Sequence, residues 1–418
     1  MAKKIKNKLT FIDLFAGCGG LSEGFLQTDN FEALAHIEWE LPMVNTLRNR
    51  LHVKWNHSVE DAMKRVIHFD IQKTEELIRG NWSTESLKDY GFTNHDSLLS
   101  NGLKGIIGKQ KVDLIIGGPP CQAYSIAGRA QDKNSMKDDY RNYLFESFVK
   151  VVDEFKPEVF VFENVPGLLS ATPGGKPVTE RIYEAFNEVG YEIRQPTLLK
   201  KSVYTASELG VPQKRNRVII IGVNKSNKIS LEELYNELDR QKKSITPKNV
   251  QDAIGHLPKF KPLKNQKKVN GKNVSHELIK DDHVKFHEAR FHNQRDIEIF
   301  RNWLKNEMNK SSSQNKISFY NDLMGKKSNH AKYRNLEWDK PSPTVVAHLY
   351  KDGLMFIHPD VNQARSITVK EASLLQSFPD DFEFIGSQGF AFKMIGNAVP
   401  PEMAKNIAIA ISQKLKAK

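Results

Sequence analysis

Short apolar runs of about four to eight residues recur through the first half of the chain. Each is bounded by Gly, Pro or Asn, as is typical of buried strands in a parallel sheet. Between them lie stretches such as YLFESFVKVVDEF, whose apolar residues are spaced as on one face of a helix. This alternation predicts an α/β fold with a doubly wound, mostly parallel sheet and helices on both faces. The runs are LTFIDLF from Leu9, VDLIIGG from Val112, EVFVFENV from Glu158 and RVIIIGV from Arg217.

The pattern changes after Val223, where the sequence becomes rich in Lys and Asn and has few apolar runs. We therefore expect a first domain over residues 1–223 and a smaller, irregular domain over 224–390. The remaining segment, 391–418, ends in a helix by its period. One side of that helix carries Met403, Ile407, Ala410 and Ile411.

Charge and cysteine content narrow the function classes. The 418 residues hold 62 Lys and Arg against 50 Asp and Glu, a net charge of +12, which suits a polyanionic partner such as nucleic acid. Only Cys18 and Cys121 are present, too few for a disulfide framework or a zinc site, so we expect no metal and a reducing, cytoplasmic compartment. No run approaches the roughly 20 apolar residues that a membrane span needs.

The segment IDLFAGCGG, from Ile12 to Gly20, reads as a strand followed by a glycine-rich turn that can approach a ligand closely. The third glycine of the dinucleotide fingerprint is replaced by Ser22. Further on, Glu38 with Trp39 could hold ribose hydroxyls and Asp70 an adenine amine. Taken singly, Trp39 could be core packing and either carboxylate a helix cap. Together they predict an acidic adenosine pocket that suits a sulfonium cation better than a pyrophosphate.

A candidate reacting centre lies at the ends of three predicted strands. Cys121 follows one of them directly, behind two prolines, and Glu163 ends the next. Arg215 and Arg217 alternate in PQKRNR, so we expect them to point the same way. The alternatives are a buried cysteine, a helix-capping carboxylate and a solvated basic edge.

In combination these segments resemble the cytosine-5 DNA methyltransferases. DLFAGCGG, EW, DI, PPCQ, ENV and QKRNR occur in that family's order, and ITVKEASLLQSFPDDF and IGNAVPP resemble its last two motifs. The resemblance covers residues 9–223 and 340–418. It is weaker over 72–111, which we expect to form a surface helix and loop, and weakest over 224–335.

The resemblance implies an S-adenosylmethionine-dependent methyltransferase fold. A target-recognition domain over 224–390 would precede a C-terminal segment that completes the catalytic domain. It also implies S-adenosylmethionine as methyl donor, and it assigns Arg217 to the cytosine carbonyl. The positions expected to bind the cofactor are Phe15, Ala16, Gly17, Gly20, Leu21, Glu38, Trp39, Asp70, Ile71, Pro119, Leu144, Asn397 and Val399.

The chemistry explains why such residues are needed. Carbon 5 of cytosine is a poor nucleophile, and attack of a thiolate on carbon 6 makes the ring electron-rich enough to take a methyl group. We expect Cys121 to be that thiolate, ionised with the help of Arg215 and Arg217, and Glu163 to protonate ring nitrogen 3. The target base must leave the duplex stack for any of this to occur.

Three rival hypotheses remain: a transfer-RNA cytosine-5 methyltransferase, a DNA-binding regulator that has lost activity, and a nucleotide-dependent oxidoreductase. The last leaves PPCQ, ENV and QKRNR without a role. The expected partners are double-stranded DNA and, functionally, a restriction endonuclease whose cleavage the methylation would block. We expect a monomer with no membrane partner, and base-reading side chains within 224–335.

Overall fold

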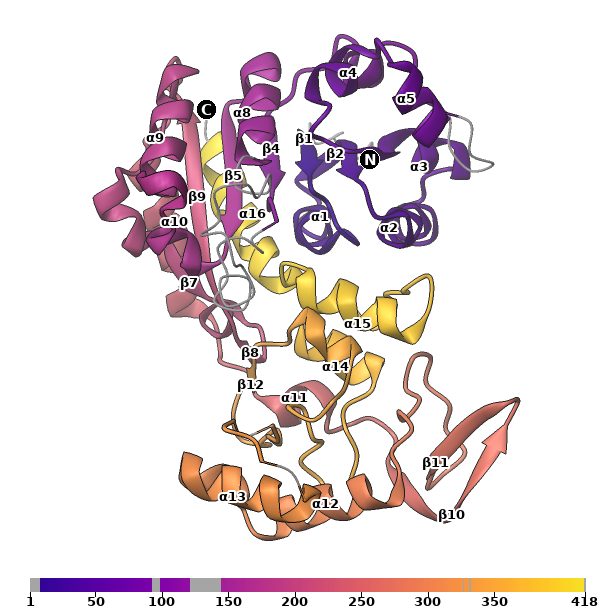
Figure 1. Ribbon diagram of the computed structural model, residues 1–418. Coiled ribbons are helices and arrows are strands. Elements are labelled where there is room, and N and C mark those ends of the chain that lie inside the picture. Colours follow the sequence, from indigo (N-terminus) through magenta and orange to yellow (C-terminus); the bar gives the residue numbers. More distant parts are fainter. Residues whose placement is uncertain (1–7, 92–97, 121–143, 326, 331, 417–418) are drawn as a thin grey trace, which may run out of the picture.

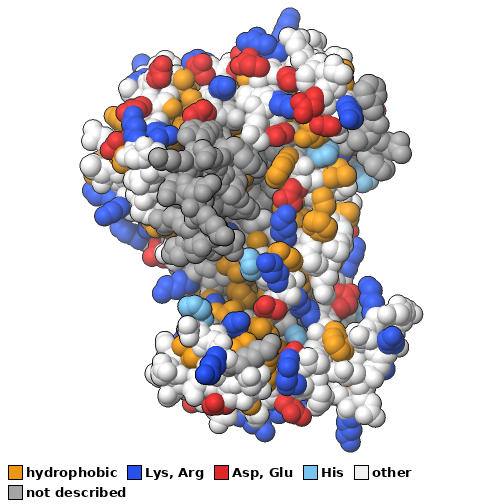
Figure 2. Space-filling view, in the orientation of Figure 1, with side chains coloured by type: hydrophobic (Ala, Val, Ile, Leu, Met, Phe, Trp, Pro, Cys, Tyr) orange, Lys and Arg blue, Asp and Glu red, His pale blue; other side chains and the backbone are white. Residues whose placement is uncertain are grey.

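The computed structural model describes residues 8–91, 98–120, 144–325, 327–330 and 332–416. The chain forms two lobes that meet at a narrow waist (Figures 1 and 2). The first holds the large sheet. The second holds two longer helices, α12 (Gln294–Lys305) and α13 (Ser313–Met324), with a two-stranded ribbon. No helix among the described residues is long and apolar enough to cross a membrane.

The sheet confirms the predicted mostly parallel α/β fold. Its strand order is β3-β2-β1-β4-β5-β9-β6, and a further strand, β7, also pairs with β9. β1, β2, β3, β4 and β5 run parallel, as buried apolar strands joined by crossovers should. The strands are β1 (Leu9–Leu14), β2 (Phe31–Glu38), β3 (Val66–His68), β4 (Leu114–Gly117), β5 (Val159–Asn164), β6 (Tyr191–Glu192), β7 (Val203–Thr205) and β9 (Asn216–Asn224).

The expectation that RVIIIGV is a parallel strand is wrong, because β9 runs antiparallel to both β5 and β6. An apolar run shows that a strand is buried on both faces, but it carries no information on strand direction. The reversal has a structural consequence. Asn164, at the end of β5, pairs with Val218, near the start of β9, so these two ends share one edge of the sheet.

Helices cover both faces of the sheet. Phe25 of α1, Leu234 of α10 and Ile407 of α16 are fully buried in the cluster on one face. Phe148 of α8 and Phe186 of α9 are fully buried in the cluster on the other. The main covering helices are α1 (Gly20–Leu26), α2 (Leu41–Val53), α3 (Val59–Arg65), α8 (Leu144–Phe155), α9 (Val178–Glu188), α10 (Leu231–Ser244) and α16 (Pro401–Leu415).

One part of the first lobe differs from the sequence-based expectation. The segment 72–111, expected on the surface, forms α4 (Thr74–Arg79), α5 (Thr84–Ser86) and α6 (Gly102–Ile107), and Leu77 and Leu103 are fully buried in the core. Its polar composition concealed the few apolar positions that pack inward.

The three-part division of the chain stays a prediction. Because α10 belongs to the first core, the packing favours a boundary after Ser244 rather than after Val223.

The second lobe is made of short elements around two apolar clusters. Besides α12 and α13 it contains α11 (Val250–Ile254), β10 (Phe260–Val269), β11 (Lys272–Leu278) and α14 (Val369–Leu375). Helix α15 (Gln388–Asn397) lies at the waist between the lobes (Figure 1). Cys18 and Met43 of the first lobe pack into the same cluster as Ile395 of α15, so the two lobes share a hydrophobic contact.

The second lobe also has a buried polar core. Arg365 is fully buried and donates to both carboxylate oxygens of Glu371, at 2.7 and 2.6 Å. Burial alone would raise the pKa of Glu371, but the Arg365 charge and its hydrogen bonds hold that pKa well below its usual range. His358 lies 3.5 Å from the same carboxylate. A paired and hydrogen-bonded charge of this kind is tolerated in a protein interior.

Four buried histidines surround this pair. Desolvation lowers the pKa of His276 to about 4 and that of His292 and His358 to about 3, and it also lowers the pKa of His287. Three of them have a ring nitrogen within hydrogen-bond distance of a protein oxygen; His276 Nε2, for example, is 2.9 Å from the Gln363 carbonyl oxygen. The fourth, His358, accepts at Nδ1 from Asp360 N at 3.2 Å. All four are therefore neutral in the folded protein near neutral pH.

We expect the free energy of unfolding to fall as the pH drops from about 6.5 towards 3. The unfolded histidines take up protons below their ordinary pKa of 6.5, whereas His292 in the folded protein does so only near pH 3. The unfolded state then binds more protons, and acid favours it. Denaturant midpoints measured from neutral pH downwards would test this. His276→Gln should weaken the pH dependence, the exposed control His283→Gln should not, and a flat profile would contradict the account.

Candidate active site

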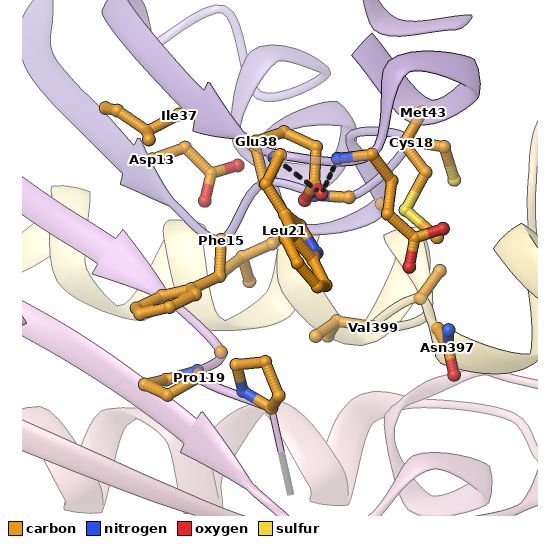
Figure 3. A pocket seen from close by; sticks show the side chains of 18 of the residues that line it. Asp13, Phe15, Cys18, Leu21, Ile37, Glu38, Met43, Pro119, Asn397 and Val399 are labelled. Carbon is orange, nitrogen blue, oxygen red and sulfur yellow. Dashed lines mark hydrogen bonds between the residues drawn. The ribbon is translucent and has the colours of Figure 1, made fainter. Parts of the chain in front are cut away.

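A cavity of about 280 Å³ lies at the carboxyl edge of the sheet. The ends of β1, β2, β4 and β5 reach it, and α15 leads into the segment that closes it (Figure 3). Glu163 and Arg217 line the same cavity. So does every residue predicted to bind a cofactor: Phe15, Ala16, Gly17, Gly20, Leu21, Glu38, Trp39, Asp70, Ile71, Pro119, Leu144, Asn397 and Val399.

The glycine-rich turn brings the backbone to the cavity floor. Gly17 and Gly19 have φ values of 57° and 91°, a left-handed conformation that favours glycine. At Gly20 the need is space rather than conformation, because a Cβ there would lie 2.4 Å from the Val399 carbonyl oxygen. The turn and the segment after α15, far apart in sequence, are thus held in direct contact around the cavity.

Glu38 is fixed by backbone donors. Its Oε2 accepts from Gly17 N at 2.8 Å, and its Oε1 accepts from the N–H groups of Trp39 and Glu40, both at 2.9 Å. Burial raises the pKa of Glu38 to about 6 even though these hydrogen bonds lower it. Trp39 is 53% exposed, which excludes the core-packing alternative for that side chain.

Asp13 is a residue of this site that the sequence analysis did not identify. It is 1% exposed and lines the cavity beside Phe15 and Glu38 (Figure 3). Ser22 donates its hydroxyl to Oδ2, whereas Oδ1 is buried without a hydrogen-bond partner among the described residues. A buried carboxylate oxygen left in this state is costly unless a ligand pairs with it. The sequence feature that could have identified Asp13 is a charged residue inside an otherwise apolar strand.

Glu163 and Arg217 form a nearly buried ion pair that also lines the cavity. Arg217 Nε lies 2.6 Å from Glu163 Oε1, and the two side chains are 12% and 10% exposed. The Glu163 carboxylate packs so tightly on Gly118 that a Cβ there would lie 2.7 Å from Oε2. Asn164 donates to the Pro119 carbonyl at 3.2 Å, which fixes the backbone that leads towards Cys121.

Of the two cysteines, only Cys18 lies among the described residues. Cys121 lies outside the described residues. Cys18 is 2% exposed, and burial raises the pKa of its thiol to about 12, so it is not available as a thiolate at neutral pH. Any nucleophilic thiol chemistry in this chain must therefore use Cys121.

The prediction that Arg215 and Arg217 point the same way is wrong. Arg215 is 1% exposed and does not line the cavity; it donates to the carbonyls of Val345 at 2.9 Å and Gly396 at 3.0 Å. Side-chain alternation holds within one continuous strand. Here β8 (Gln213–Lys214) ends before Arg215, and β9 begins after it.

Comparisons with known proteins agree with this site. The model of the C-5 cytosine-specific DNA methylase family matches residues 9–81 and 79–413. Type II methyltransferase M.Bpa9945I of Bacillus paralicheniformis is 35% identical, with 96% of this chain and 98% of the relative covered. Type II methyltransferase M1.HphI of Haemophilus parahaemolyticus is 32% identical, with 96% and 86% covered.

A similar fold occurs in a solved structure of a prophage-encoded DNA modification methyltransferase from E. coli. It shares 23% identity and a TM-score of 0.63, with 98% of this chain and 100% of that one covered. The family is described for DNA, so the RNA alternative is not favoured. The chain belongs to the C-5 cytosine-specific DNA methylase family and is a DNA cytosine-5 methyltransferase of the restriction-modification type.

Proposed function

We propose that the cavity holds S-adenosylmethionine and that Cys121, Glu163 and Arg217 act on a cytosine rotated out of duplex DNA. The observation that carries this proposal is the Glu163–Arg217 ion pair, which lines the same cavity as Asp13 and Glu38. A cofactor held by Asp13 and Glu38 would therefore share one cavity with a base held by the ion pair.

The residues present fit a cationic cofactor. Asp13, Glu38, Glu40, Asp70 and Glu163 give the cavity five carboxyl groups, and Arg217 is the one cation among the described lining residues. The unpartnered Asp13 Oδ1 suits an ammonium or sulfonium group, and Glu38 suits ribose hydroxyls. A pyrophosphate would meet repulsion instead, which argues against the oxidoreductase alternative. When bound, S-adenosylmethionine supplies the methyl group as an electrophile.

The chain's own groups prepare the base. As its ion pair with Arg217 loosens, Glu163 takes up a proton from solvent. The Cys121 thiolate then forms a bond to carbon 6 while Glu163 delivers that proton to ring nitrogen 3, so the ring becomes an enamine. Arg217, released from part of its contact with Glu163, donates to the cytosine carbonyl and holds the ring in place. After methylation a base takes the carbon 5 proton, the Cys121–carbon 6 bond breaks with release of the thiolate, and ring nitrogen 3 returns its proton to Glu163. This set of groups would have no use in a regulator that only binds DNA.

The second lobe supplies a basic element for holding DNA. The ribbon of β10 and β11 ends in a tight turn with positive φ at Asn270 (49°) and Gly271 (78°). Its outer part, residues 264–273, is exposed throughout, and blue side chains mark this edge of the lower lobe in Figure 2. A two-stranded ribbon fits the DNA major groove, and its lysines can neutralise phosphates. They are Lys264, Lys267, Lys268 and Lys272.

The remaining parts of the proposal concern organisation. The second lobe, from about residue 245 to 390, would be the target-recognition domain, and residues 391–418 would complete the catalytic domain. We propose that the enzyme acts as a monomer in the cytoplasm and needs no metal. Its methylation would protect DNA from a partner restriction endonuclease.

Expression in a methylation-free host followed by bisulfite sequencing should reveal 5-methylcytosine at one recurring sequence. Cys121→Ser should abolish the marks, because the hydroxyl is too weak a nucleophile to attack carbon 6. Cys18→Ser is the matched control and should retain the pattern if the variant folds. Identical marks from Cys121→Ser would refute the proposed nucleophile.

Binding of S-adenosylhomocysteine, followed by the fluorescence of Trp39, should weaken about ten- to a hundredfold in Asp13→Asn and in Glu38→Gln. Each change removes a charge-assisted hydrogen bond to the ligand, typically about 1.5 to 3 kcal/mol. Asp153→Asn, at an exposed position paired with Lys156, is the control and should bind as the wild type does. Unchanged affinity in both cavity variants would place the cofactor elsewhere.

Replacing Lys264, Lys267, Lys268 and Lys272 with Gln should lower the slope of log K for DNA against log salt concentration. Each phosphate that the protein no longer neutralises reduces that slope by about 0.9. The matched control replaces Lys200, Lys201, Lys225 and Lys228, four exposed lysines of the first lobe, and should leave the slope intact. Equal slopes for the two variants would show that the ribbon does not touch DNA.

A further inference from the structure

Arg215 joins two segments that are distant in sequence. Its guanidinium donates to the carbonyl of Val345 in the second lobe and to the carbonyl of Gly396 at the end of α15. Beside it, β8 pairs in parallel with β12 (Ser342–Pro343). A fully buried arginine that donates to backbone carbonyls is an expensive way to fill space. We therefore expect its role to be to hold together the segments that it connects.

Gln213 extends the same junction. It is fully buried, and its Oε1 accepts from Val345 N at 2.9 Å. Its Nε2 donates to the side chain of Gln376, which in turn donates to the Ala398 carbonyl at 2.6 Å. The chain of hydrogen bonds thus runs from Val345 to the segment that directly follows α15.

A second arginine holds the other end of the same segment. Arg290 donates to the carbonyls of Leu349 at 2.5 Å and Tyr350 at 3.2 Å, and its guanidinium lies over the ring of Phe392 in α15 at 5.0 Å. Residues 342–350, which we name the clamped segment, are therefore fixed to α15 at both ends. Between these ends the contact is close: a Cβ at Gly396 would lie 2.3 Å from Ala347 N.

The clamped segment has two different sides. On the inner side, α15 ends at Asn397 and leads into Ala398 and Val399, and all three residues line the cofactor cavity. On the outer side, Val346 and Tyr350 are each 43% exposed, although both are large and apolar or aromatic. The segment belongs to the lobe that we have proposed to hold DNA. One short piece of chain thus separates the two ligand sites.

We propose that Arg215 and Arg290 are positioning residues that couple the cofactor cavity to the DNA-binding lobe, so that cofactor and DNA bind cooperatively. The inference rests on the proposed function for the identity of the two ligands. A ligand on Asn397 and Val399 restrains the end of α15, the two arginines pass that restraint to the clamped segment, and DNA meets a surface already ordered. By thermodynamic linkage, DNA must then tighten cofactor binding by the same factor.

The test measures that factor directly. The dissociation constant of S-adenosylhomocysteine is measured with and without a duplex oligonucleotide that carries the sequence found methylated by bisulfite sequencing. In the wild type we expect DNA to tighten binding about 5- to 150-fold, the usual range for coupled sites. In Arg215→Met and in Arg290→Met the factor should fall to near one, while each ligand alone still binds. Arg215→Lys, which keeps one donor group, should retain part of the wild-type coupling factor.

The matched control is Arg194→Met. Arg194 is also a nearly buried arginine, but it is paired with Glu232 and stacked on Tyr235 at 3.5 Å, two residues of α10 rather than of the clamped segment or α15. Its loss should lower the melting temperature and leave the coupling factor unchanged. If Arg215→Met fails to melt cooperatively, Arg290→Met and Arg215→Lys decide the matter.

Three results would overturn the inference: no coupling in the wild type, wild-type coupling in the clamp variants, or an equal loss of coupling in Arg194→Met. Each of these results can be distinguished from failure of the proposed function. If the proposed function were wrong, the wild type would leave no methyl marks, and no target sequence would be found.

Discussion

The antiparallel pairing of β9 with β5 is the constraint on which the candidate site depends. Parallel strands β1, β2, β4 and β5 bring only their carboxyl ends to the cavity edge, but β9 brings its amino end there. Glu163, at the end of one strand, and Arg217, at the start of the next, can therefore form an ion pair at 2.6 Å. With β9 parallel, Arg217 would lie at the opposite edge of the sheet, and the cavity would have no cation among its described lining residues.

The parts that could be predicted from the sequence are those in which local sequence determines local structure. The glycine-rich turn needs residues that tolerate left-handed backbone, and Gly17 and Gly19 adopt it. Apolar runs between such turns indicated the buried strands, and all thirteen predicted cofactor residues line one cavity. Their ligand contacts stay predictions. The resemblance to the family, confirmed by the match over residues 9–81 and 79–413, added the order of the motifs.

The parts that could not be predicted depend on contacts between distant segments. Arg215 donates hydrogen bonds to residues 130 and 181 positions away in the sequence. The local sequence therefore does not show that its side chain points away from that of Arg217. Asp13 matters because one buried oxygen lacks a partner among the described residues, and the four histidines because they surround Arg365 and Glu371. The packing of α10 on α16, which favours a boundary after Ser244, is likewise set by tertiary contacts rather than by the change in composition after Val223.

The most direct test of the central claim is a covalent trap. DNA in which cytosine is replaced by 5-fluorocytosine cannot lose its carbon 5 substituent, so the adduct formed with S-adenosylmethionine present should persist through denaturation. Digestion and mass spectrometry should then find the modified nucleotide attached to Cys121 alone. Attachment at Cys18, or active methylation of ordinary DNA with no trapped adduct, would contradict the account.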